Sequence, residues 1–112
     1  MSKARGLVLQ NALAAYLRTW WPAAESAGAG RPGTDILGTP GIVWENKTAH
    51  AFRAYDWARQ AKGHARNGEL PVVVYWPDGM GAASAGDVLA IVPLRELVKM
   101  ILIGDLSEGG SE

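Results

Sequence analysis

The run Val72-Val73-Val74-Tyr75-Trp76 constrains the fold of this chain more than any other segment. It consists of β-branched and aromatic residues, which favour strands, and it shows no alternation between apolar and polar positions. A strand without alternation is typical of the middle of a sheet that is covered on both faces. The run therefore predicts a layered domain in which helices pack above and below a central sheet.

The composition allows one such domain. The chain has 112 residues, of which 48% are apolar and 20% charged, the proportions of a globular protein. We expect the domain to span residues 1–104, followed by a solvated acidic tail at 105–112 (DLSEGGSE). The absence of cysteine excludes disulfide scaffolds, thiolate zinc sites and cysteine nucleophiles. No apolar run of membrane-spanning length and no signal-peptide pattern is present, so the cytoplasm is the expected location.

The charge is balanced overall, but the expected domain is mildly basic. The chain has 11 basic and 11 acidic residues, which argues weakly against a nucleic-acid-binding protein. Three of the acids and none of the bases lie in the segment 105–112, so residues 1–104 carry 11 basic and 8 acidic groups. Binding of nucleic acid by the domain therefore stays open.

Periodic apolar positions predict three helices and several short strands. The expected helices are Lys3–Trp20, stopped by Pro22; Ala51–Asn67, capped by Gly68; and Leu94–Ile103, begun by Pro93. Besides the run at 72–76, the expected strands are Asp35–Leu37, Ile42–Trp44 and a buried strand at Val88–Val92. The turn residues Gly38-Thr39-Pro40-Gly41 favour a tight hairpin between the first two strands. The expected order is α-β-β-β-α-β-β-α, a mixed sheet flanked by helices.

Three charged residues in the stretch GTDILGTPGIVWENK carry the most chemical information. Asp35 begins one strand of the expected hairpin, and Glu45 and Lys47 follow the next strand. Positions 45 and 47 face the same way on a strand, because the side-chain period is two. The hairpin would fold Asp35 back beside Glu45. Two carboxylates and one ammonium group are therefore expected at one place.

Hard divalent cations bind to oxygen sites of this kind. Mg²⁺ is commonly held by one or two carboxylates, with water and phosphate oxygens completing its shell. We expect Asp35 and Glu45 to be ligands, with the backbone carbonyl of Asn46 as a further oxygen. Such a metal polarises a phosphodiester and lowers the pKa of a bound water. Lys47 is expected to orient that water or to stabilise charge on the phosphate.

The chain resembles the PD-(D/E)xK nuclease superfamily, and more narrowly the Holliday junction resolvases encoded by phages of actinobacteria. The resemblance runs from about Gly6 to Ile101. It is carried by GLVLQNALAAYLR, WWPAAESAGAGRPGTDILG, GIVWENKTA, WARQAK and DVLAIVPLRELV. It implies a restriction-endonuclease-like α/β fold and Mg²⁺-dependent cleavage of branched DNA, with Mn²⁺ as a substitute metal. It also implies a homodimer, since a junction presents two strands to cut.

The resemblance also implies roles for single residues. Asp35 and Glu45 match the metal ligands, Lys47 matches the catalytic lysine, and Gln60 matches a supporting polar position on the following helix. Two positions depart from the family pattern. Thr34 stands where a proline often precedes the first acid, and Gln10, at the border of the first helix's apolar face, stands where resolvases usually have a glutamate ligand. Glu25 is an alternative source of that negative charge.

Seven basic residues are candidates for binding the DNA backbone. Arg59, Lys62 and Arg66 step by three and four along the second expected helix, which places them on one face. The full set is Lys3, Arg5, Arg31, Arg53, Arg59, Lys62 and Arg66. A solvated helix surface explains the same pattern equally well, and contacts to phosphate would make binding strongly dependent on salt.

The leading hypothesis is a structure-selective endonuclease. The alternatives are the same fold acting on flaps, mismatches or duplex, a DNA-binding protein of weakened activity, and a small interaction protein with no DNA role. Asp35 as a turn residue and Glu45 with Lys47 as an ordinary surface ion pair belong to the last alternative. Apolar residues of the first helix, or Val98, Met100 and Ile101 of the last, are the candidate dimer interface.

Overall fold

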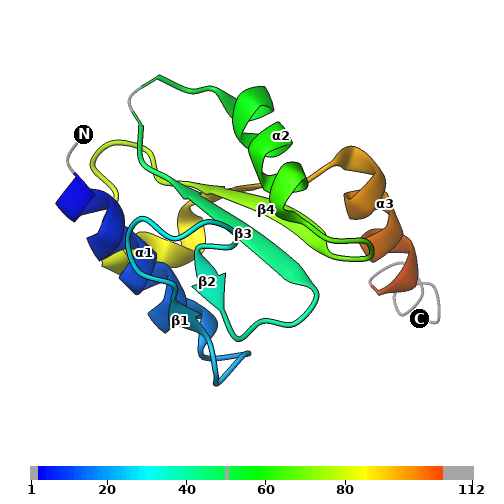
Figure 1. Ribbon diagram of the computed structural model, residues 1–112, viewed down its shortest axis with the longest axis horizontal. Helices are drawn as coiled ribbons and strands as arrows, with labels where there is room; N and C mark the ends of the chain where they lie inside the picture. The colour runs from blue at the N-terminus through cyan, green and yellow to red at the C-terminus, as the bar shows by residue number, and fades with distance from the viewer. Residues whose placement is uncertain (1–2, 50, 105–112) are drawn as a thin grey trace.

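The apolar run lies in the middle strand of a three-stranded sheet, as predicted. β4 (Leu70–Tyr75) pairs with β3 (Ile42–Lys47) in parallel and with β5 (Leu89–Ile91) in antiparallel orientation, so the sheet is mixed. A crossover that returns parallel to its starting strand needs a helix between them, and α2 (Ala54–His64) supplies it. Figure 1 shows β4 running through the centre of the molecule between the helices.

The computed structural model describes residues 3–49 and 51–104, except for the side chain of Lys3. The elements outside the main sheet are α1 (Lys3–Leu17), β1 (Glu25–Ser26), β2 (Ile36–Leu37), the 3₁₀ helix η1 (Ala82–Asp87) and α3 (Leu94–Ile103). Their order is αβββαββα, as expected, but the first strand, β1, lies in a segment where the sequence patterns predict no strand. The predicted tail at 105–112 lies outside the described residues.

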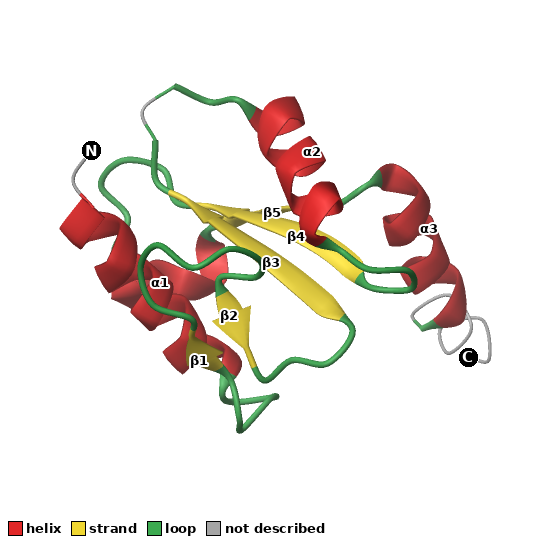
Figure 2. Cartoon of the chain, in the orientation of Figure 1, coloured by secondary structure: helices red, strands yellow, loops and turns green. Residues whose placement is uncertain are grey.

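Two separate clusters of apolar side chains cover the two faces of β4. On one face, Val72, Val74 and Trp76 pack with Leu9 and Leu13 of α1. The opposite face carries Val73, which packs with Trp57 and Ala61 of α2. Figure 2 shows α1 and α2 on opposite sides of the sheet. The domain is therefore a mixed α/β unit in which the continuous apolar run is explained by burial on both faces.

The predicted hairpin is wrong. β2 pairs with β1 in a two-stranded antiparallel sheet, and the structure shows no ladder between β2 and β3. The reason lies in Thr34 and Asp35, which contact β3 through isolated hydrogen bonds rather than through a ladder. Asp35 N–H donates to the carbonyl of Trp44 at 2.9 Å, and Trp44 N–H donates to Thr34 Oγ1 at 2.9 Å. After this contact the chain leaves β3 and joins β1. Asp35 is nevertheless brought beside β3, as expected.

Several element boundaries and burial patterns also differ from the predictions. α1 ends at Leu17 because the next residues form turns, so Tyr16 and Trp20 are exposed and pack edge to face, with ring centroids 5.1 Å apart. α2 ends at His64 rather than Asn67, because Ala65 is extended and closes the last turn with its own N–H. The predicted buried strand β5 is largely exposed, since it forms the outer edge of the sheet. α3 has the predicted bounds.

Gly38 makes the closest backbone approach among the described glycines, and its replacement tests the link between β1 and β2. Its φ is +83°, and a Cβ there would lie 2.1 Å from the carbonyl oxygen of Ala23. Gly41 has φ +86° with nothing within 4 Å of such a Cβ. We expect Gly41→Ala to cost about 1 kcal/mol and Gly38→Ala about 3 kcal/mol or more, measured by urea unfolding. Equal costs for the two variants would contradict the close approach.

No helix among the residues that the structure describes is long and apolar enough to cross a membrane.

Candidate functional site

The outer edge of β3 is closed by side chains instead of by another strand. The backbone carbonyls of Gly41, just before β3, and of Lys47, at its end, point toward β4. They accept hydrogen bonds from Leu70 N–H at 2.7 Å and from Trp76 N–H at 2.9 Å, respectively. Asn46, next to Lys47, faces the other way and donates its N–H to Oδ2 of Asp35 at 2.7 Å. This hydrogen bond fixes the Asp35 carboxylate at the edge of the sheet.

Glu45 and Lys47 lie together on the face of the sheet that α2 covers. They share this face with Val43 because side chains alternate along a strand. Lys47 Nζ lies 3.2 Å from Oε2 of Glu45, and the two side chains are 23% and 8% exposed, respectively. The predicted placement of Glu45 and Lys47 on one face of the strand is therefore present, Asp35 lies beside them at the strand edge, and the Glu45 carboxylate is almost fully removed from water.

Both carboxyl groups have a raised pKa. Burial raises the pKa of Asp35, against the opposing effects of the Asn46 hydrogen bond and of the positive charges of Lys47 and His64. Burial also raises the pKa of Glu45, and the Asp35 carboxylate raises it further, while Lys47 and His64 lower it. The effect of Asp35 on the pKa of Glu45 indicates that the two carboxylates are close enough to interact electrostatically. A cation placed between them would relieve both the repulsion and the loss of hydration.

His64 interacts electrostatically with both carboxylates, and the sequence analysis did not select it. It is the last residue of α2. Trp57, Ala61 and His64 are spaced by four and three residues, which places them on the same side of a helix, and Trp57 and Ala61 face the sheet. The spacing of His64 from the buried Trp57 and Ala61 is the sequence signal that could have identified it. This signal becomes informative only once it is known which face of α2 packs on β3 and β4.

The donor set fits a hard cation with few protein ligands. The described residues contain no group of three or more histidine, aspartate or glutamate side chains that could hold a metal. Two carboxylates suffice for Mg²⁺, which keeps several waters. In the described part of the chain, one oxygen of each carboxylate is engaged, Oδ2 of Asp35 by Asn46 and Oε2 of Glu45 by Lys47. Oδ1 of Asp35 and Oε1 of Glu45 are the oxygens that remain for a metal.

Asn46 contributes to this edge mainly through its backbone. Its side-chain Oδ1 accepts a hydrogen bond from Trp76 Nε1 at 2.7 Å, so the amide is committed to the core on the α1 side. Its carbonyl points to the same side of the strand as its N–H, toward Asp35. The predicted use of the Asn46 carbonyl as an oxygen ligand is therefore compatible with the strand geometry.

Gln10 anchors the glycine-rich loop. It is 8% exposed, and its Nε2 donates to Ser26 Oγ at 2.8 Å and to the carbonyl of Gly28 at 3.4 Å. Ala27, between these two acceptors, donates its N–H to the backbone carbonyl of Asp35. Gln10 therefore holds the segment that supports Asp35. The Gly28 carbonyl requires a donor that a glutamate carboxylate cannot supply, whereas the Ser26 hydroxyl can donate to either side chain.

Gln10→Glu is expected to destabilise the protein by about 1–3 kcal/mol at neutral pH, because a largely buried carboxylate would face the Gly28 carbonyl without a donor, although the Ser26 hydroxyl can still donate to it. Thermal unfolding of the variant against wild type measures the cost. A variant as stable as wild type, with increased affinity for Mg²⁺, would contradict the anchoring role and support a vacant ligand position of the resolvase type.

The remaining supporting candidates lie apart from the carboxylates. Gln60 is exposed on α2, one position before the buried Ala61. Glu25 is exposed on β1, where its backbone pairs with Leu37. Neither side chain forms a hydrogen bond to Asp35 or Glu45 in the described structure, so their assignment to the site stays a prediction.

The basic candidates do not form one continuous stripe. Arg59 and Lys62 are exposed on α2, whereas Arg66 lies beyond its end, so the predicted helical row of three is wrong. Arg53 forms an exposed ion pair with Asp56 at 2.9 Å. Arg5 lies on α1, on the opposite side of the sheet, and donates to the carbonyl of Met80 at 3.5 Å. Arg31 is exposed in the glycine-rich loop, and the side chain of Lys3 lies outside the described structure.

No family model matches this chain, and comparisons with curated proteins and with solved structures found no match either.

The raised pKa values predict how stability depends on pH. Between the ordinary values, 3.8 for Asp35 and 4.5 for Glu45, and the raised folded values, the folded protein binds more protons than the unfolded chain. The free energy of unfolding contributed by this pair therefore falls as pH rises through that window. We expect the stability difference between wild type and the double variant Asp35→Asn, Glu45→Gln to change in this direction in unfolding curves recorded from about pH 4 to 7. A constant difference would contradict the electrostatic description.

Proposed function

We propose that this protein is a metal-dependent DNA endonuclease with a restriction-endonuclease-like PD-(D/E)xK domain, which acts as a homodimer on four-way junctions. The observation that carries the proposal is the arrangement at β3: Asp35 is fixed at the strand edge by Asn46 N–H, and buried Glu45 lies beside Lys47. Two buried carboxylates of raised pKa beside a lysine at the outer edge of β3 suit metal-assisted phosphodiester hydrolysis.

The order of elements supports the same proposal. α1, the glycine-rich loop, Asp35 before β2, Glu45 and Lys47 on β3, and then α2 follow one another as in the nuclease layout that the sequence resembles. The fold assignment itself belongs to the proposal, because a small mixed α/β domain is compatible with more than one family.

Each residue of the site has a defined task in this proposal. Asp35 and Glu45 would hold Mg²⁺, which would polarise the phosphodiester and acidify a bound water. The hydrogen bond from Asn46 keeps Asp35 aimed at the strand edge. Lys47, held by Glu45, presents its ammonium group to the attacking water or to the charge that develops on the phosphate. His64, at the end of α2, interacts electrostatically with both carboxylates.

A second candidate is a junction-binding protein that has lost cleavage. The observation that favours it is Gln10, whose amide is used for two loop contacts where a resolvase would have a ligand carboxylate.

Cleavage of defined DNA structures separates these candidates. Wild-type protein is incubated with an immobile four-way junction, a flap and a linear duplex of the same sequences, in Mg²⁺, Mn²⁺ or EDTA. The proposal predicts paired nicks in the junction that require metal. Cleavage of flap or duplex at the same rate indicates a nuclease of other selectivity, binding without cleavage in either metal indicates the second candidate, and absence of binding at low salt indicates no DNA role.

A further inference from the structure

α3 is rich in large apolar residues, and all of these are exposed, although it also carries Arg95 and the ion pair of Glu96 with Lys99. Its residues Leu94–Ile103 include no buried position, and neither core cluster contains any of them. The exposed fractions of its large apolar side chains range from 37% at Ile101 to 78% at Ile103. The exposed apolar residues are Leu94, Leu97, Val98, Met100, Ile101, Leu102 and Ile103. A contiguous apolar surface of this kind marks a contact with another molecule.

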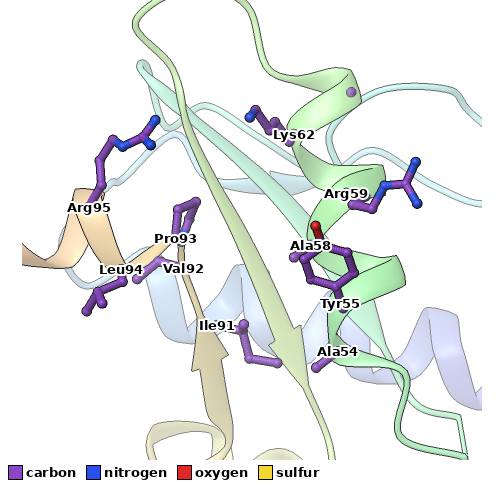
Figure 3. A pocket seen from close by; sticks show the side chains of 11 residues that line it. Ala54, Tyr55, Ala58, Arg59, Lys62, Ile91, Val92, Pro93, Leu94 and Arg95 are labelled. Carbon is purple, nitrogen blue, oxygen red and sulfur yellow. The ribbon is translucent and has the colours of Figure 1, made fainter.

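An open groove begins where α3 begins. It has a volume of about 990 Å³ and lies between α2 and the chain that leads from β5 into α3. Its floor is apolar, formed by residues such as Ala58, Ile91 and Val92. Figure 3 shows α2 on one side of the groove and Ile91, Val92 and Pro93 on the other, with Arg59, Lys62 and Arg95 around it. The groove thus combines an apolar floor with three cations and no acidic lining residue.

We propose that α3 is the dimer interface, with the α3 helices of two copies packed antiparallel so that the C-terminal end of each enters the groove of the other. In a two-fold contact between antiparallel helices, the C-terminal end of one lies beside the N-terminal end of its partner. The groove is located at the N-terminal end, at Leu94 and Arg95. The apolar floor would therefore receive Ile101 and Ile103 of the second copy.

Charge complementarity selects this occupant. A helix C-terminus carries partial negative charge on its unpaired carbonyls, which is stabilised by nearby cations. The second copy's α3 would direct this end at Arg59, Lys62 and Arg95. The sequence after Gly104, DLSEGGSE, adds three acids and no base. A DNA backbone matches the cations but not the apolar floor, so a second copy of this chain fits the groove better.

The interface deepens the proposed function, which calls for two copies, but it is tested without DNA. Molecular mass is measured by light scattering over a range of protein concentrations for wild type, Val98→Glu and Val8→Glu. Val98 and Val8 are 44% and 62% exposed on α3 and α1, so the two variants make the same change on alternative candidate surfaces. Unfolding curves confirm that each variant is folded.

We expect wild type and Val8→Glu to have about twice the chain mass of 11.9 kDa, and the dimer dissociation constant of Val98→Glu to rise at least tenfold. A wild type that stays monomeric at all concentrations, or a dimer disrupted by Val8→Glu and not by Val98→Glu, overturns the proposal. Failure here leaves the junction-cleavage assay to decide the proposed function separately.

The groove contact has its own matched pair, Arg59→Glu and Arg31→Glu. Both arginines are exposed, but only Arg59 lines the groove. Arg59→Glu is expected to weaken dimerisation severalfold and Arg31→Glu to leave it unchanged. Equal effects of the two variants would overturn the part of the proposal that seats the helix end in the groove.

Discussion

Glu45→Gln is expected to abolish DNA cleavage while making the protein more stable. The carboxylate is buried and faces the repulsion of Asp35, so its removal relieves an unfavourable interaction in the folded state. A gain of about 1 kcal/mol is usual when a functional site of this kind is neutralised. It corresponds to a rise in melting temperature of roughly 4 °C for a domain of this size. Loss of a metal ligand should reduce the cleavage rate by about 10³-fold.

The opposite signs of these two effects make the test specific. Glu69→Gln is the matched control: Glu69 accepts the N–H of Arg66 through Oε1, which glutamine can also do. It should leave both activity and stability unchanged. Mg²⁺ should raise the melting temperature of wild type and of Glu69→Gln, but not that of Glu45→Gln. A Glu45→Gln variant that is less stable than wild type would show that the Lys47 ion pair, rather than a metal, explains the carboxylate.

Trp76→Ala is expected to have the largest effect on stability. Trp76 is fully buried, and its Nε1 donates to Asn46 while its backbone N–H donates to Lys47. Truncation leaves a large cavity in the α1-side cluster and removes the hydrogen bond of the Asn46 side chain. A loss of about 3–5 kcal/mol is expected in urea unfolding, enough to unfold much of a marginally stable population.

Trp20→Ala provides the comparison for this variant. Trp20 is 57% exposed and contacts Tyr16 edge to face. The same truncation there should cost about 1 kcal/mol or less, because little cavity is formed and only the aromatic pair is lost. Similar costs at both positions would contradict the central location of Trp76.

The central strand and the final helix could be predicted because local patterns determine them. The continuous apolar run has one stable environment, between two covered faces, and β4 occupies it. α3 begins after Pro93, whose fixed φ suits the first turn of a helix. In both cases the sequence signal and the tertiary packing agree, so the bounds and type of the element follow from the chain itself.

The pairing of β2 could not be predicted in the same way. Glycine and proline at 38–41 indicate a turn, but they do not specify which strand is the partner. The partner is decided by Thr34 and Asp35, whose side chains take the outward N–H groups of Trp44 and Asn46. Competition between side-chain and backbone acceptors depends on three-dimensional approach, which periodicity does not encode.

The sequence predicted the three charged residues of the candidate site, but not the roles of the residues around them. The grouping of Asp35, Glu45 and Lys47 follows from a period of two along one strand and from a chain reversal before it. His64 and the loop role of Gln10 depend on how α2 and α1 pack on the sheet. Which residues a packed helix contributes to a site depends on how the helix is rotated about its axis. That rotation is known only once the packing of the core is known.

The most direct test of the central claim is cleavage of an immobile four-way junction and a matched linear duplex in Mg²⁺ by wild type and by Lys47→Ala. Lys47 is partly exposed, so its removal should leave the fold intact, and circular dichroism checks this. We predict symmetric paired nicks in the junction alone, which are lost in EDTA and in Lys47→Ala. A wild-type protein that binds the junction without cutting it, in Mg²⁺ or Mn²⁺, would contradict the assignment of Asp35, Glu45 and Lys47 as a nuclease site.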